Sequence, residues 1–199
     1  MVPVLAVTGG VGAGKSVFVR HLETLGARVL DADAEAHAVL DEPRVRDELV
    51  RRFGGDILTD DGRADRQALA ERVFRDAESL RRHTEVVYPA LRRRLGRRLA
   101  DLRETDARPV VLEAATLFEA GARDLVDHVV TVEAPLPLRE ERCRTARGWT
   151  PGEATRRDAF LLGEEERRRR ADEVVENTGD ENDLRRAAEA VYRRLCAST

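Results

Sequence analysis

Short apolar runs alternate with longer amphipathic stretches along most of this 199-residue chain. The first run, Val4-Leu5-Ala6-Val7, is typical of a buried strand, and similar runs recur further along. Strands that alternate with helices favour a parallel sheet covered on both faces. We therefore predict an α/β fold whose five strands lie at about residues 3–8, 28–31, 109–113, 128–133 and 173–176.

A glycine-rich segment joins the first predicted strand to the first predicted helix. From Gly9 to Ser16 it reads G-x-x-x-x-G-K-S, the P-loop, whose backbone N–H groups cradle phosphates. Lys15 is the one lysine among 35 lysine and arginine residues, which fits a compact point charge on phosphate oxygens. Ser16 is the expected hydroxyl ligand of Mg²⁺. The residues expected to contact the nucleotide are Gly10, Gly12, Ala13, Gly14, Lys15, Ser16 and Val17.

Two long stretches interrupt the alternation of strands and helices. Residues 36–104 contain no convincing strand and carry helical charge patterning. Residues 137–171 are similarly helical and rich in arginine. We expect 36–104 to be a helical insertion that binds the acceptor substrate and 137–171 to be a mobile lid. The nucleotide-binding core then comprises residues 1–35 and 105–199.

Carboxylates follow two of the predicted strands, at the sheet edge where α/β proteins bind ligands. Asp31 and Asp33 come directly after the second strand and point to the same side if the segment stays extended. A carboxylate there could accept the proton of a hydroxyl that attacks a γ-phosphate, and we favour this role for Asp33 over helix capping. Glu113 closes the third strand and could hold Mg²⁺ or a substrate hydroxyl. Glu119, further on, is equally consistent with a solvated side chain and a ligand.

Arginines crowd the predicted lid. Arg142, Arg144 and Arg147 lack matching acids one turn onward. Such arginines could stabilise the charge of a transferring phosphoryl group, and Arg147 is the first candidate. Trp149 is expected to anchor the lid. A salt-bridged helix explains most of the second arginine run, with i,i+4 pairs worth about 0.2–0.5 kcal/mol each. These pairs are Glu164–Arg168, Glu165–Arg169 and Glu166–Arg170.

Composition and charge argue against several classes of binding partner for this protein. The formal net charge of −3 and the pI of about 5.9 argue against a general nucleic-acid binder. Cys143 and Cys196 form no metal-binding pattern, and the four histidines show no ligand spacing. No apolar stretch approaches the ~18 residues that a membrane span needs, and the chain runs from Met1 directly into the first strand. We expect a cytoplasmic monomer or weak homo-oligomer that binds neither nucleic acid nor membrane.

These residues resemble the dephospho-CoA kinase family over nearly the whole chain. Val7 to Ser16 is close to the family's TGG-x-G-x-GKS opening, and Asp31-Ala32-Asp33 is similar to its DAD segment. Residues 53–69 resemble its FG…DG…R-x-x-L stretch. Leu117-Phe118-Glu119 resembles the end of its PLLFE motif, and residues 171–179 resemble its AD-x-V-I-x-N-x-G segment near the nucleotide base.

The resemblance implies a P-loop kinase with a five-stranded parallel sheet, a helical substrate-binding insertion and a helical lid. Such an enzyme uses ATP and Mg²⁺ to phosphorylate the ribose 3′-hydroxyl of dephospho-CoA. The resemblance places the catalytic base on Asp33 and brings Asn177 to the nucleotide. The expected catalytic residues are Asp33, Lys15 and Arg147; the expected metal ligands are Ser16 and Glu113; the expected acceptor contacts are Asp33, Tyr88, Glu113 and Thr116.

The chain departs from the family pattern on the acceptor side and in the lid. Tyr88-Pro89 stands where the family has His-Pro, and residues 113–119 read EAATLFE in place of DVPLLFE. Residues 157–163 keep only the arginine of R-I-x-x-Q-x-P. Phosphorylation of dephospho-CoA is the leading interpretation. The alternatives are a related kinase for another nucleoside- or pantetheine-like alcohol, and a non-catalytic nucleotide-binding regulator.

Overall fold

A computed structural model describes residues 2–105 and 108–197. Contacts divide the chain into two compact units, residues 1–31 with 98–199, and residues 32–97. The sequence predicts an insertion over 36–104, whereas the second unit spans 32–97. The unit begins at Ala32 because a helix starts there directly after a strand, and the unit ends inside a long helix. That this unit binds the acceptor stays a prediction.

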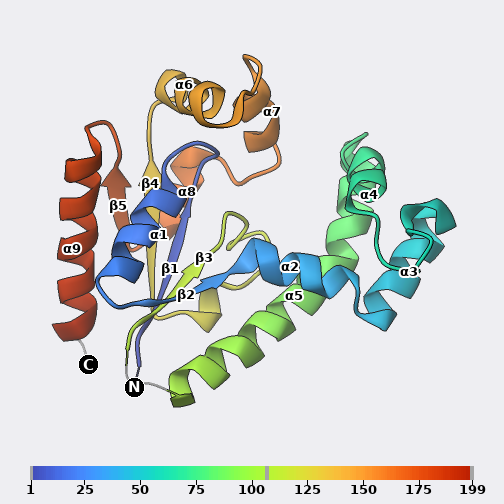
Figure 1. Cartoon of the computed structure of the whole chain (residues 1–199), viewed down its shortest axis with the longest axis horizontal. Helices are drawn as coiled ribbons and strands as arrows, with labels where there is room; N and C mark the ends of the chain where they lie inside the picture. Colours follow the sequence, from blue (N-terminus) through green and yellow to red (C-terminus); the bar gives the residue numbers. More distant parts are fainter. Residues whose placement is uncertain (1, 106–107, 198–199) are drawn as a thin grey trace. The chain divides into compact units, whose positions relative to one another are not determined.

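The first unit is built on a five-stranded parallel sheet (Figure 1). Its strand order is β2-β3-β1-β4-β5, and all neighbouring strands run parallel. The α/β fold class and the five predicted strands are confirmed, with every end within one residue of its expected place. The strands are β1 (Val4–Gly9), β2 (Arg28–Asp31), β3 (Val110–Glu113), β4 (His128–Glu133) and β5 (Glu173–Glu176).

The core of the first unit lies between the sheet and two helices, α1 (Lys15–Thr24) and α9 (Glu181–Ala197), which pack side by side (Figure 1). Phe18 and Leu22 of α1 are fully buried in this core, and α9 contributes Val191 and Leu195. Burial of each such side chain stabilises the fold by roughly 1.5–3 kcal/mol. The packing fixes α1 against β1, and thereby the loop between them.

Three helices form the predicted lid segment in the first unit: α6 (Leu136–Arg147), α7 (Glu153–Asp158) and α8 (Glu164–Arg170). A short 3₁₀ helix, η2 (Arg123–Leu125), precedes β4. The helical character of residues 137–171 is confirmed up to the end of α8, and the mobility of this segment stays a prediction. Across the described residues, no helix is both long and apolar enough to span a bilayer.

The second unit is helical, as predicted for residues 36–104. Within residues 32–97, all of which are described, the only β-pairing is an isolated bridge between Leu58 and Ala64. The unit contains α2 (Ala32–Leu40), α3 (Pro43–Phe53), the 3₁₀ helix η1 (Gly55–Ile57), α4 (Arg66–Val73) and the first part of α5 (Ala77–Thr105).

His83 in α5 makes this unit sensitive to acid. Its Nδ1 atom is buried and has no hydrogen-bond partner among the described residues, and burial lowers the pKa of the imidazole to about 4. The unfolded chain therefore binds a proton on His83 at a higher pH than the folded chain does. The neutral His83 side chain thereby adds up to about 3 kcal/mol to the free energy of unfolding. This contribution is complete above about pH 6.5 and is lost as the pH falls towards 4.

We therefore expect His83→Leu to reduce the acid lability of the protein. Between pH 7 and pH 4.5, urea unfolding should show a loss of stability that is smaller than in the wild type by about 2 kcal/mol. His37→Leu, which changes an exposed histidine of α2 in the same unit, is the matched control and should follow the wild type. Equal losses in His83→Leu and the wild type would contradict the assignment.

Candidate active site

The P-loop leaves β1 at Gly9 and enters α1 at Lys15. Gly12 and Gly14 adopt φ values of 75° and 104°, a left-handed region that favours glycine. The Lys15 side chain lies along the loop, and Nζ donates to the carbonyl oxygens of Gly9 and Gly10 at 2.9 Å each. The strand, glycine loop and helix thus occur in the order that the sequence predicts, with the lysine at the loop.

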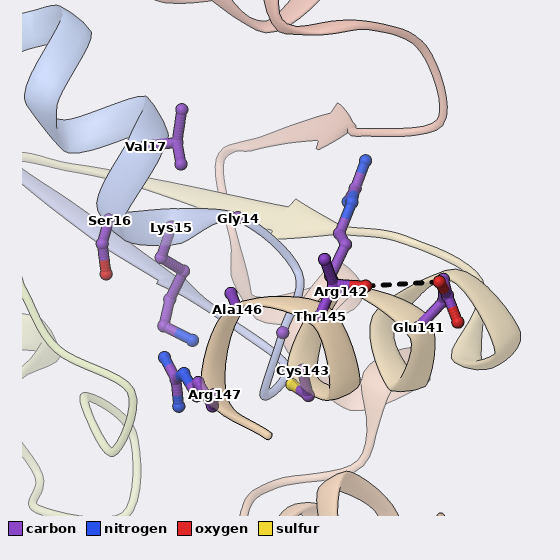
Figure 2. Close-up of a pocket in the computed structure, with 11 residues that line it drawn as sticks. Gly14, Lys15, Ser16, Val17, Glu141, Arg142, Cys143, Thr145, Ala146 and Arg147 are labelled. Atoms are coloured by element: carbon purple, nitrogen blue, oxygen red, sulfur yellow. Dashed lines mark hydrogen bonds between the residues drawn. The ribbon is translucent and has the colours of Figure 1, made fainter. Parts of the chain in front are cut away.

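A cavity of about 490 Å³ separates the P-loop and the start of α1 from α6 (Figure 2). In Figure 2 the Lys15 ammonium and the Arg147 guanidinium point into the same part of the cavity, and Arg142 points away from them. Two converging cations favour an anionic ligand there. The lining residues are Gly12, Gly14, Lys15, Ser16 and Val17 from the loop side, and Glu141, Arg142, Cys143, Thr145, Ala146 and Arg147 from α6.

Ser16 and Glu113, the two expected metal ligands, lie in contact. The Ser16 hydroxyl donates to Glu113 Oε1 at 2.6 Å. Oxygen ligands of this kind suit Mg²⁺, which keeps several waters and shares substrate phosphates instead of requiring a full protein cage. In the described residues no group of three or more His, Cys, Asp or Glu side chains could hold a metal ion. The two oxygen donors of Ser16 and Glu113 fit Mg²⁺ that is held together with a nucleotide, and this ligand role stays a prediction.

Asn177 contacts the P-loop but is not among the residues that line the cavity. Its Nδ2 donates to the Ala13 carbonyl at 2.8 Å, and a Cβ at Gly14 would lie 2.2 Å from that nitrogen. Its Oδ1 accepts from Arg142 Nη2 at 3.3 Å. Ala13 and Gly10, expected at the nucleotide, are buried and are absent from the lining of the cavity.

Arg142 both lines the cavity and contacts Asn177, a residue from a distant part of the chain. It lines the cavity, and its Nη1 is buried with no partner among the described residues. Burial lowers the pKa of this guanidinium. The contact with Asn177 spans 35 residues, so the helical pattern of the lid cannot predict it.

Arg147, the first candidate for charge stabilisation, lies beside an aromatic ring. Its Cζ is 4.8 Å from the centroid of Trp149, and Arg157 Cζ lies 4.3 Å from the same ring. Each cation–π contact at an exposed site is worth about 0.5–1 kcal/mol. Trp149 thus favours one orientation of a guanidinium that lines the cavity.

Loss of the Trp149 ring is therefore expected to impair Arg147. In Trp149→Leu, kcat/KM for ATP should fall by about 2–5-fold, because roughly 0.5–1 kcal/mol of orientation is lost. Trp149→Phe keeps an aromatic face and should recover most of the rate. Steady-state kinetics on the two variants check the expectation, and it is wrong if both match the wild type.

The second arginine run is only partly the surface helix that its charge pattern predicts. Glu164–Arg168 and Glu166–Arg170 are paired as expected, but Arg169 pairs with Glu166, so the Glu165–Arg169 pair is wrong. Neighbours at both i,i+3 and i,i+4 are within reach on a helix, and one glutamate here serves two arginines. Arg144 likewise has an acid partner one turn earlier, in Glu141.

Arg167 in the same run is buried. Its Nε and Nη2 donate to the two carboxylate oxygens of Glu133 at 2.8 and 2.9 Å, and the two residues are 1% and 0% exposed. Burial lowers the pKa of Arg167, but the hydrogen bonds and charge of Glu133 outweigh it and raise the net pKa. Arg167 Nη1 also donates to the Leu162 carbonyl, and Glu119 accepts from the Leu162 N–H. Glu119 thus holds the segment between α7 and α8.

Asp33 lies in the first turn of α2, in the second unit. The extended segment that would place Asp31 and Asp33 on one side is wrong, because β2 ends at Asp31 and α2 begins at Ala32. The N-cap alternative for Asp33 is wrong for the same reason, since the helix has already begun. Asp31, at the end of β2, is in register with Glu113, and the chain enters α2 from there.

The other expected acceptor residues come from separate elements. Tyr88 lies in the part of α5 that belongs to the second unit, and Thr116 lies in the segment after β3, in the first unit. Glu113 ends β3. The structure thus groups Lys15, Ser16 and Glu113, and assigns Asp33 and Tyr88 to the other unit.

The parallel sheet carries a P-loop after its first strand, and two arginines of α6, Arg142 and Arg147, line the cavity opposite that loop. These features place the molecule in the class of P-loop kinases. The family model of dephospho-CoA kinase, CoaE, matches residues 3–183. The chain therefore belongs to the dephospho-CoA kinase family, the one that its motifs resemble, and is an ATP-dependent phosphotransferase.

Individual relatives agree with this assignment. The dephospho-CoA kinase of Corynebacterium diphtheriae is 38% identical over 96% of each chain. That of Deinococcus radiodurans is 40% identical over 96% of this chain and 91% of its own. The crystal structure of TT1252 from Thermus thermophilus is similar over 98% of both chains, with 36% identity and a TM-score of 0.79. The similarity spans both units and is not confined to the P-loop.

Proposed function

We propose that this protein transfers the γ-phosphoryl group of ATP to the ribose 3′-hydroxyl of dephospho-CoA, which gives CoA and ADP. Membership of the dephospho-CoA kinase family, over the length of both units, is the observation that carries the proposal. The cationic cavity beside the P-loop supports the nucleotide half of the reaction. The choice of dephospho-CoA as the acceptor rests on membership of the family.

Residues of the first unit would bind ATP and stabilise its charge. Lys15 would exchange its contacts with the Gly9 and Gly10 carbonyls for phosphate oxygens. Ser16 and Glu113 would hold Mg²⁺, which neutralises phosphate charge when bound. Arg147, oriented by Trp149, would stabilise the charge of the phosphoryl group during transfer.

Asp33 would act as the general base. The acceptor 3′-oxygen forms a bond to the γ-phosphorus while the bond from that phosphorus to the β–γ bridging oxygen breaks, and the hydroxyl proton passes to the Asp33 carboxylate. Two features support this role: Asp33 is exposed, and it follows Asp31, whose register partner Glu113 contacts Ser16.

A panel of acceptors tests the proposal. Initial rates of ADP release from MgATP should be far higher with dephospho-CoA than with adenosine, pantetheine or no acceptor. A clear preference for another alcohol would favour the second candidate, a related kinase with an altered acceptor. The departures from the family pattern at Tyr88, Ala115 and Thr116 are the observation that favours that candidate. Nucleotide binding without transfer to any acceptor would indicate a regulator.

A further inference from the structure

Asp158, the last residue of α7, lies against the P-loop. Its Oδ1 accepts from the Val11 N–H at 2.8 Å, and its Oδ2 accepts from Arg139 Nη1 at 2.6 Å. The same Arg139 nitrogen donates to the Val11 carbonyl at 3.2 Å. Both backbone polar groups of Val11, in the middle of the P-loop, are therefore bonded to one ion pair from the lid segment.

The pair is withdrawn from solvent. The side chains of Arg139 and Asp158 are 5% and 18% exposed, and Arg139 Nε also donates to the Ala134 carbonyl at 3.0 Å. Removal of one partner of a buried pair is costly, because it leaves the other charge uncompensated. Such a contact keeps its geometry better than an exposed ion pair, so it is suited to holding a loop in place.

The glycines of the P-loop leave room for this contact. A Cβ at Gly10 would lie 2.8 Å from Arg139 Nη1, and a Cβ at Gly12 would lie 2.8 Å from the Arg139 carbonyl oxygen. Neither Arg139 nor Asp158 lines the cavity beside Lys15. The ion pair thus holds the P-loop from its outer side, away from the lining that would meet phosphates.

We propose that Asp158 is a positioning residue that fastens α7 of the lid to the P-loop and, together with Arg139, holds the loop ready for the nucleotide. The inference rests on the proposed function, in which the P-loop binds ATP. The contact needs the Asp158 carboxylate, because an aliphatic side chain at this position could accept no hydrogen bond from the Val11 N–H.

Nucleotide affinity tests the inference without any acceptor. In Asp158→Ala we expect the dissociation constant of MgADP, measured by calorimetry, to rise at least tenfold, and kcat/KM for ATP to fall in proportion. The value of kcat should stay within threefold, because Asp158 does not line the cavity. Glu165→Gln, which removes an exposed carboxylate of α8, is the matched control and should bind like the wild type. A dissociation constant of Asp158→Ala within twofold of the wild type would overturn the inference.

A double variant separates positioning from simple stability. Arg139→Met with Asp158→Leu removes both charges and leaves no ion unpaired, so the fold should regain stability that Asp158→Ala loses. The Val11 N–H still lacks its acceptor, and we expect weak MgADP binding to persist in a protein with a normal melting temperature. Recovery of wild-type affinity would show a merely structural role and overturn the inference. Inactivity of the wild type with dephospho-CoA would instead refute the proposed function, whatever these affinities are.

Discussion

Replacement of Lys15 by alanine is expected to abolish phosphoryl transfer, with kcat at least about 10²–10³-fold below the wild type. The Lys15 ammonium already lies at the P-loop, 2.9 Å from two of its carbonyl oxygens, and it lines the nucleotide cavity. Lys15→Arg should also be inactive, because a planar guanidinium fork is larger than an ammonium and cannot make the same point contact. Release of ADP in the presence of dephospho-CoA measures both rates.

Arg20→Ala is the matched control for Lys15→Ala. It removes an exposed cation from the same helix and should change kcat less than twofold. Circular dichroism and a melting curve show whether each variant is folded. Normal turnover by a folded Lys15→Ala protein would contradict the assignment of the P-loop as the phosphate site.

Asp33→Asn is expected to lower kcat by a factor on the order of 10²–10⁴ while the affinity for ATP stays nearly unchanged. Asparagine has the shape of aspartate but cannot take up the proton of the attacking hydroxyl. Because Asp33 is not among the residues that line the cavity beside Lys15, the variant should leave that cavity intact. Single-turnover rates and the dissociation constant of MgADP separate the two effects.

Asp47→Asn in α3 makes the same chemical change at an exposed aspartate of the second unit and should keep the wild-type rate. If Asp33→Asn also keeps it, Asp33 is not the general base. The carboxylates at the ends of β2 and β3, Asp31 and Glu113, would then be the next candidates.

The sheet could be predicted from the sequence because parallel strands that are covered on both faces must be nearly continuous apolar runs. Val4 to Val7 is such a run, and all four residues are fully buried. The P-loop could be predicted because its chemistry demands particular residues at fixed spacing. The contact of Ser16 with Glu113 depends also on the strand order, which the structure supplies, since β3 lies beside β1 and ends at Glu113.

Contacts of residues 137–171 with the P-loop and with β4 could not be predicted, because they join residues that are distant in the chain. Glu133 and Arg167 are 34 residues apart, and Asp158 and Val11 are 147 apart. Charge patterns along a helix reveal only neighbours at i,i+3 and i,i+4, and therefore assign Arg167 to a solvated face. The helical conformation of Asp33 could not be predicted either, since one residue at a helix boundary decides whether Asp33 lies in an extended segment or a helical turn.

The most direct test of the central claim is to identify the product formed from dephospho-CoA and MgATP. Mass spectrometry and ³¹P NMR should show CoA phosphorylated on the ribose 3′-hydroxyl, with one ADP released for each CoA formed. Phosphate found at another hydroxyl, or ADP released without a phosphorylated acceptor, would contradict the account.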